Sequence, residues 1–160
     1  MDESRYRLST IFGRLWAPRG SKPLCFTNGL TSKVNVFGSL DEEGKFIHMF
    51  SDIQNSEIFI EFLQKLLIEY SKILLVTDNA PWHRSKRTKE FIEKNDERIE
   101  IVFLPPYSPE MNPAEECWRR TRMNVTTNRY FDTKQEMENT LSEFFNNHIF
   151  NINLLNYLGL

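Results

Sequence analysis

The spacing of apolar residues changes twice in the first half of the chain, and no other feature of the sequence constrains the fold as much. VNVFGSL (34–40) and KFIHMF (45–50) alternate as β-strands do, and the DEEG between them predicts a hairpin. The next segment, 55–70, has apolar residues at helical spacing, with Asn55 as its N-cap. KILLVT (72–77) is then almost continuously apolar, as in strands that are buried on both faces. This order predicts an α/β fold.

The second half of the chain continues this alternation of helix and strand. The patterns predict a helix over 85–94, a strand at IEIVFL (99–104), and helices over 113–124 and 133–148. We therefore expect a central sheet covered by helices on both sides, in one domain spanning residues 1–160. A strand in DESRYRL would start at the first residues of the chain, so we expect a truncated first strand.

The composition is that of an ordinary globular protein. Of the 160 residues, 40% are hydrophobic and 26% are charged, and the net charge of −2 argues against a surface coated with basic residues. Cys25 and Cys117 form no Cys-x-x-Cys pair, so we expect reduced thiols. The sequence has neither an apolar run as long as a membrane span nor a signal-peptide pattern, which predicts a cytoplasmic protein.

Two acidic residues stand at positions that suggest a site. Asp78 directly follows the apolar strand, at the edge where ligands gather in open α/β sheets, although DNAP is also good turn chemistry. Glu115 stands three residues after Asn112, with Pro113 at the first helical position, a pattern typical of a capping box. A carboxylate in the first helical turn is also kept ionised by the helix dipole, which suits a ligand for a divalent cation. Both interpretations remain open on these residues alone.

A stiff segment leads to Glu115. LPPYSPEMNPAEECW (104–118) has four prolines before the glutamate, and prolines restrict the chain and fix the geometry of its approach. Metal catalysis requires ligands that are held in such a fixed geometry. Capping explains a glutamate at the start of a helix but does not explain this approach, which favours a functional role for Glu115.

Three segments together resemble the catalytic domain of DDE transposases, in the mariner-like and related bacterial and archaeal insertion-sequence group. MDESRYRL (1–8) resembles the segment of the first acid, and LLVTDNAPWHRS (74–85) resembles that of the second. LPPYSPEMNPAEECWRR (104–120) resembles the segment of the third acid, with its Asn-Pro-x-Glu motif. The last two are long and specific, and the separation of their acids suits the family.

The resemblance implies a ribonuclease H-like fold with a mixed central sheet. It also implies that Asp2, Asp78 and Glu115 are catalytic and bind two Mg²⁺ or Mn²⁺ ions, with Glu116 a neighbour and not a ligand. Two such ions about 4 Å apart hold the attacking and leaving oxygens of a phosphodiester, and carboxylate oxygens suit both metals. The implied reaction is hydrolysis of DNA, followed by attack of the freed 3′-hydroxyl on target DNA.

The resemblance implies further roles around this triad. Asn79 and His83 would support the site, and DNA would be the partner of a homodimer. Family members normally carry N-terminal helix-turn-helix modules; residues 1–160 include none, so we expect no sequence-specific recognition of transposon ends from this polypeptide. The candidate phosphate contacts are Arg84, Lys86, Arg87, Arg119, Arg120 and Arg122.

Two other functions are compatible with the sequence. The first is a truncated or decayed transposase remnant that folds and is catalytically silent, with at most weak DNA binding. The second is an unrelated Zn²⁺ metallohydrolase that uses His48 and His83, although the sequence has no histidine motif with the spacing of metal ligands. These functions differ in metal dependence and in their sensitivity to loss of Asp78 or Glu115.

Overall fold

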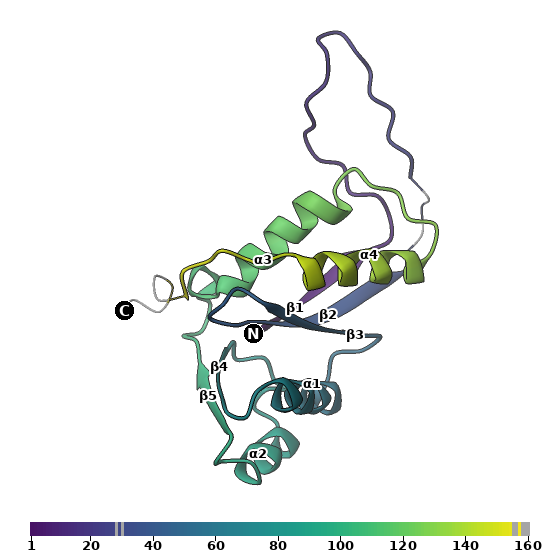
Figure 1. The fold of residues 1–160 in the computed structure, drawn as a ribbon. Coiled ribbons are helices and arrows are strands. Elements are labelled where there is room, and N and C mark those ends of the chain that lie inside the picture. Colours follow the sequence, from purple (N-terminus) through teal and green to yellow (C-terminus); the bar gives the residue numbers. More distant parts are fainter. Residues whose placement is uncertain (28, 30, 155–156, 158–160) are drawn as a thin grey trace.

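The fold is described by a computed structural model over residues 1–27, 29, 31–154 and 157. Its first three strands pair antiparallel in the order β1-β2-β3, and the last two form a parallel pair. The backbone nitrogen of Met1 donates a hydrogen bond to the Val76 carbonyl (2.8 Å), so the start of β1 lies against β4. The mixed arrangement expected from the sequence is confirmed (Figure 1). The strands are β1 (Asp2–Arg7), β2 (Lys33–Leu40), β3 (Phe46–Ser51), β4 (Ile73–Thr77) and β5 (Ile99–Phe103).

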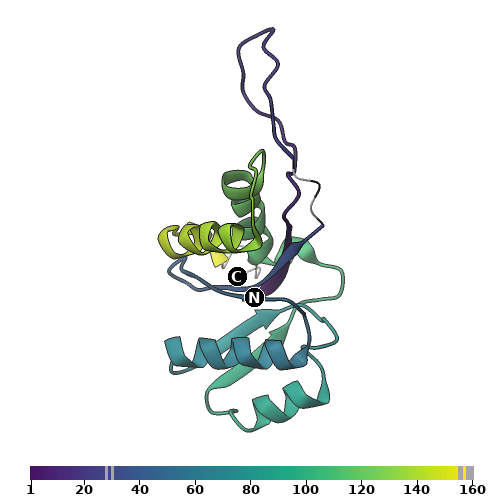
Figure 2. The same ribbon diagram turned by 90° about the vertical axis from the view of Figure 1, so that its right-hand side faces the viewer.

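Helices lie on both sides of the three-stranded sheet β1-β2-β3. Figure 2 shows α3 and α4 (green and yellow) on one side, and α1 and α2 (teal) on the other. The predicted cap at Asn55 is present, because its side chain accepts a hydrogen bond from the Ile58 N–H (3.0 Å). Ser85, for which no cap was predicted, caps the second helix in the same way. The helices are α1 (Ser56–Glu69), α2 (Lys86–Glu93), α3 (Pro113–Thr121) and α4 (Lys134–Asn147).

Strand alternation divides the interior into two cores. Tyr6 of β1 packs under α3 and α4 with Trp118, whereas Met1 packs under α1 with Phe59. The first core is tight around Gly38, because a Cβ atom built there would lie 2.5 Å from the Trp118 ring. Gly38 therefore leaves the space that the Trp118 indole occupies.

The expectation that the first parallel strand is buried on both faces is wrong. Leu75 of β4 is 4% exposed against α1, but Leu74 on the opposite face is 63% exposed. Val102 of the neighbouring β5 is 43% exposed as well. The apolar run is continuous, but no described helix packs on the outer face of these two strands.

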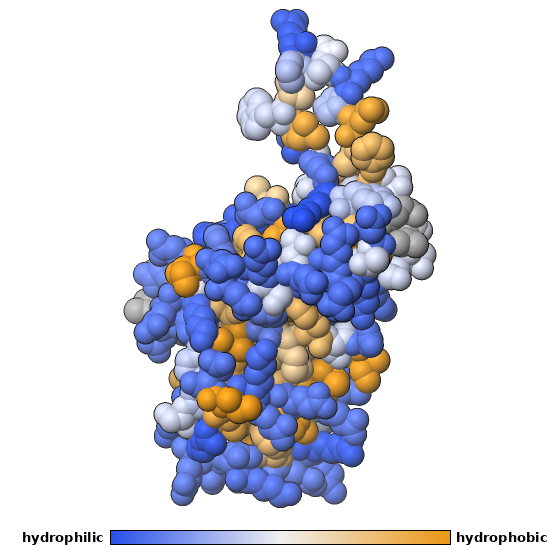
Figure 3. All heavy atoms as spheres, turned by 45° about the vertical axis from the view of Figure 1, so that its right-hand side comes forward, coloured by the Kyte–Doolittle hydropathy of each residue, from blue (hydrophilic) through white to orange (hydrophobic). Residues whose placement is uncertain are grey.

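A long arm joins β1 to β2 and extends away from the sheet (Figures 1 and 3). At its base, the Gly13 N–H donates to the Asn128 side-chain oxygen (2.9 Å), and Ile11 bridges to Thr127. The sequence indicated only an irregular segment here. Several large apolar side chains of the arm are exposed, among them Phe12, Leu15, Trp16, Leu24 and Phe26.

The helix expected over 113–124 is α-helical only as far as Thr121. It continues as a π-helix, η2 (Arg122–Thr126), and ends beside the base of the arm. Among the described residues, no helix is both long enough and apolar enough to span a membrane.

Candidate active site

The three acids predicted from the sequence line one open cleft of about 470 Å³. Asp2 is the first residue of β1, Asp78 directly follows β4, and Glu115 lies in the first turn of α3. The opposite wall of the cleft is the segment from Leu104 to Pro109. Three separate parts of the chain thus deliver carboxylates to one edge of the sheet, as expected for open α/β folds.

Asp2 is held in place although its side chain is almost fully buried. One carboxylate oxygen accepts the Glu3 backbone N–H (2.8 Å), and the other accepts the Trp118 indole N–H (3.1 Å). Burial and repulsion from the Glu3 and Glu115 carboxylates raise the pKa of Asp2 from 3.8 to about 6, despite the favourable backbone hydrogen bond. A negative charge at Asp2 is therefore costly unless a cation is nearby.

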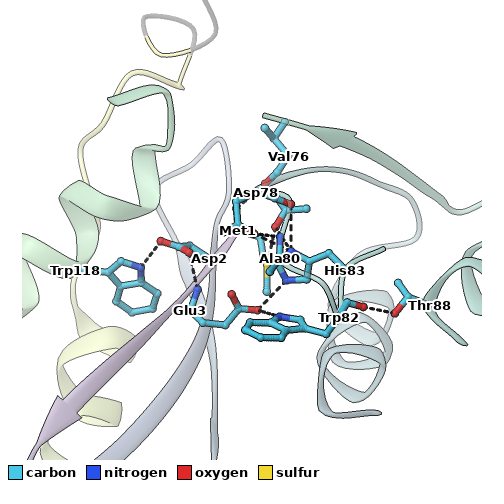
Figure 4. Close-up of polar contacts among 11 residues, drawn as sticks. Met1, Asp2, Glu3, Val76, Asp78, Ala80, Trp82, His83, Thr88 and Trp118 are labelled. Carbon is cyan, nitrogen blue, oxygen red and sulfur yellow. Dashed lines mark hydrogen bonds and ion pairs between the residues drawn. The ribbon is translucent and has the colours of Figure 1, made fainter. Parts of the chain in front are cut away.

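A buried histidine, His83, holds the Asp78 side chain in place (Figure 4). The Nδ1 atom of His83 lies 2.9 Å from an Asp78 carboxylate oxygen, and its Nε2 atom lies 2.9 Å from the Glu3 carboxylate. The Trp82 indole N–H donates to the same Glu3 oxygen (3.1 Å). The His83 side chain is fully buried, so it acts as a brace between β1 and the loop after β4.

The protonation state of His83 depends on its two carboxylate partners. Burial alone would lower the pKa of His83, but hydrogen bonds to Asp78 and Glu3 outweigh burial and raise that pKa to about 9. The hydrogen bond from His83 in turn lowers the pKa of Asp78. Asp78 is half exposed and faces the cleft, so it stays ionised and accessible.

Glu3, Asp78 and His83 are also the one group of three possible metal ligands, within the described chain, whose ligand atoms all lie within 4.8 Å of one another. Both nitrogens of His83 already face carboxylates, and its raised pKa keeps it protonated at neutral pH. A protonated imidazole has no free lone pair for a metal. We therefore interpret Glu3 and His83 as residues that position Asp78.

The capping box expected at α3 is not formed. Asn112 caps the helix, and its side chain accepts the Ala114 N–H (3.2 Å), but the Asn112 backbone N–H donates to Pro109 (3.0 Å). The Glu115 carboxylate thus has no capping role, and it makes no hydrogen bond or ion pair with any described residue. It is exposed toward the cleft and free to bind a cation.

The proline segment is tied to the loop of Asp78. The Asn79 side-chain NH₂ donates to the Leu104 carbonyl (2.5 Å), which links the end of β4 to the start of the segment. A short 3₁₀ turn, η1 (Pro109–Met111), then leads directly into α3. Asn79 thereby helps to set the separation of Asp78 and Glu115.

None of the predicted phosphate-binding residues is among the described residues that line this cleft, and each already has a partner within the protein. Arg119 and Arg120 both contact Glu116, at 2.6 and 2.7 Å, which lowers the pKa of Glu116 to about 2. Arg122 donates to Ser4 (2.6 Å). The remaining predicted residues are Arg84, which lies over the Phe103 ring, Lys86, which faces Glu90, and Arg87, which contacts Glu57.

The metallohydrolase alternative is wrong, because His48 and His83 lie in different cores. His48 contacts Phe145 of α4 and Ser142 on one side of the sheet. His83 packs against Phe59 of α1 on the other side. Burial lowers the pKa of His48 to about 4, so it is a neutral core residue.

The sequence interpretation missed the role of Glu3. It assigned a role to Asp2 and none to Glu3, although adjacent residues of a strand point to opposite faces and so have different neighbours. Asp2 faces Trp118 of α3, and Glu3 faces His83 and Trp82 (Figure 4). Strand alternation was the signal that could have separated them.

With this geometry established, comparison with known proteins identifies the family. Residues 1–138 match the model of the DDE superfamily endonucleases. The chain belongs to this family. Its curated relatives include the insertion element IS630 uncharacterized 39 kDa protein of Shigella sonnei, 28% identical over 131 residues, or 79% of this chain and 38% of the relative. The uncharacterized protein y4pE/y4sA of Sinorhizobium fredii is 40% identical over 58 residues, or 36% of this chain and 39% of the relative.

Solved structures confirm the ribonuclease H-like fold of this DDE endonuclease domain. The Mos1 strand transfer complex aligns with a TM-score of 0.74 at 16% identity, over 99% of this chain and 50% of the Mos1 chain. The catalytic domain of the Mos1 mariner transposase aligns with a TM-score of 0.59 at 18% identity, over 79% of this chain and 67% of that domain. The DDE domain described here spans about two-fifths of the length of the curated relatives that it matches.

The brace leads to a prediction about stability. Glu3→Gln is expected to lower the free energy of unfolding by about 1 kcal/mol near neutral pH, because a charged hydrogen bond becomes a neutral one. A raised histidine pKa stabilises the fold fully below the unfolded value, near 6.5, and this contribution is lost as the pH rises through about 9. The deficit of Glu3→Gln should therefore shrink between those pH values.

Urea denaturation at several pH values measures this deficit, and an NMR titration of His83 gives its pKa. The His83 pKa should fall in the Glu3→Gln variant. The interpretation of the brace is wrong if the His83 pKa is the same in both proteins.

Proposed function

We propose that this chain is the catalytic domain of a transposase that cleaves DNA and transfers the cut strand, with Asp2, Asp78 and Glu115 as its catalytic residues. The main support is the convergence of these three carboxylates on one cleft in a DDE endonuclease fold. Asp78 and Glu115 present exposed carboxylates, and Asp2 supplies a buried one. Activity in the cytoplasm, on chromosomal DNA, is part of this proposal.

The residues fit a pair of Mg²⁺ or Mn²⁺ ions. All the candidate ligands are carboxylate oxygens, which hard divalent cations prefer. Burial is the main cause of the raised pKa of Asp2, and the Glu3 and Glu115 carboxylates add to it, so a cation bound in the cleft would favour the ionised form. Structures of Mos1 complexes have been determined with Mn and with Mg. When bound, such ions activate water and stabilise charge on the attacking and leaving oxygens.

Neighbouring residues of the chain would position the metal ligands. The Trp118 indole N–H holds a carboxylate oxygen of Asp2, and His83 holds a carboxylate oxygen of Asp78. Asn79 ties the loop of Asp78 to the proline segment that carries Glu115. The protein thus holds the Asp2 and Asp78 carboxylates before substrate arrives, which lowers the cost of organising them during the reaction.

We further propose that the domain binds DNA as a homodimer. Arg119 and Lys86 have side chains that are 59% and 89% exposed, so DNA phosphates could compete for them. The arm exposes Trp16, Leu24 and Phe26 far from either core, and a second subunit would cover such apolar side chains. Multi-angle light scattering of the purified chain, with and without DNA, tests the dimer.

The function itself is tested by nicking of supercoiled plasmid in Mn²⁺, with Asp78→Ala measured alongside. The proposal expects relaxed plasmid from the wild-type protein and none from the variant. Equal nicking by both would assign the activity to another site or to a contaminant. The alternative of a silent remnant expects an intact fold and no nicking by either protein.

A further inference from the structure

Tyr107 is the most exposed aromatic residue in the wall of the cleft. Its side chain is 101% exposed, and it makes no hydrogen bond or ring contact with any described residue. It nevertheless lines the same cleft as Asp2, Asp78 and Glu115. The ring therefore adds no packing to the fold in this position and is accessible to a ligand that enters the cleft.

The backbone at Tyr107 is also strained. Its φ angle is 58°, in the left-handed region that bulky side chains avoid. Prolines stand on both sides, at positions 105, 106 and 109, and Asn79 anchors the segment at Leu104. Strain that no internal contact offsets is typical of residues that serve a ligand.

The chemistry of the wall favours a nucleobase over a phosphate. Leu104, Pro105 and Pro106 line the same cleft as Tyr107, and the described lining includes no lysine or arginine. Phosphate recognition would need such cations. An aromatic ring beside an apolar, uncharged surface can instead stack on the face of an unpaired base.

We propose that Tyr107 is a stacking platform for an unpaired nucleobase next to the scissile phosphate. This proposal rests on the proposed function, because divalent cations held by the acids of the cleft would bind that phosphate. The base would leave the duplex and lie on the Tyr107 ring while the backbone enters between Asp78 and Glu115. Tyr107 is thus a positioning residue for the substrate strand.

The test uses a fluorescent DNA duplex that ends in a short unpaired overhang containing 2-aminopurine. Binding is measured in Ca²⁺ instead of Mn²⁺ to suppress cleavage, beside a blunt duplex of the same sequence. Tyr107→Leu is expected to bind the overhang about tenfold more weakly, the typical loss for one stacked base, and to bind the blunt duplex as before. Tyr107→Phe keeps the ring and should match the wild type.

Two further readouts separate stacking from other effects. The 2-aminopurine fluorescence should be quenched on binding to the wild-type and Phe variants and stay bright with the Leu variant. Tyr130→Leu, at an exposed tyrosine outside the cleft, is the matched control and should bind like the wild type. Tyr107→Gly relieves the strained backbone, so its melting temperature should equal or exceed that of the wild type.

The outcomes are distinguishable. If the wild type nicks plasmid and the Leu variant binds the overhang as tightly as the wild type does, Tyr107 is not a stacking platform and the proposed function stands. If the Phe variant is as weak as the Leu variant, the hydroxyl group makes the contact and stacking is overturned. If the wild type neither nicks plasmid nor binds either DNA, both proposals fail together.

Discussion

Glu115→Gln is expected to abolish Mn²⁺-dependent nicking and leave the fold intact. The substitution removes a cation ligand and changes the side-chain volume very little. Because the Glu115 carboxylate is exposed and bonds to no described residue, its loss should change the free energy of unfolding by no more than about 0.5 kcal/mol. The nicking rate should fall by about 10³-fold, the scale seen when one preorganised electrostatic group is removed.

Glu116→Gln provides the matched control for this prediction. Glu116 is the next residue in the same helical turn, but it faces Arg119 and Arg120. Loss of these partly exposed ion pairs should cost about 1 kcal/mol. The rate of plasmid nicking should stay close to that of the wild type. Comparable nicking by Glu115→Gln and the wild type would remove Glu115 from the catalytic set.

Asp2→Asn is expected to stabilise the metal-free protein at neutral pH, although it removes a proposed catalytic residue. The pKa of Asp2 is raised from 3.8 to about 6 in the folded state. A raised pKa means that the fold holds the proton more tightly, so stability is greatest below pH 4 and is lost as the pH rises through 6. The loss is about 3 kcal/mol at pH 7.5, at about 1.4 kcal/mol for each pKa unit.

Asparagine has nearly the shape of aspartate and carries no charge, so it should recover part of that loss at pH 7.5. Its NH₂ group cannot accept the hydrogen bond that the second carboxylate oxygen accepts, so the variant should be less stable than the wild type at pH 4. Urea denaturation in EDTA at both pH values measures the difference. Mn²⁺ should raise the melting temperature of the wild type at pH 7.5 and leave that of Asp2→Asn almost unchanged. A variant less stable than the wild type at pH 7.5 would contradict the account of Asp2.

Local patterns in the sequence predicted most of the secondary structure. The hairpin of β2 and β3, the capped helices α1 and α2, and the strand β5 all depend on short-range spacing and capping, which the sequence carries directly. The burial of β4 was predicted wrongly because burial depends on what packs against a strand. Leu74 is exposed, and no local pattern distinguishes it from Leu75.

The same division holds for the site. The motifs at Asp78 and Glu115 were specific enough to suggest a DDE endonuclease, and their positions at a strand end and a helix start follow from local chain geometry. From the sequence alone, Glu115 could be either a helix-capping residue or a metal ligand. The structure removes the capping role, because the Asn112 N–H bonds to Pro109.

The sequence by itself thus determined the order of helices and strands, the family and the candidate acids, because each depends on residues close together in the chain. The tertiary structure alone decided that His83 braces Glu3 and Asp78, that Trp118 holds Asp2, and that the arm stands apart from both cores. Two of these contacts join residues far apart in the sequence: His83 and Glu3 are 80 positions apart, and Trp118 and Asp2 are 116 positions apart. Such pairings are set by packing across the sheet, and no local preference of the chain encodes them.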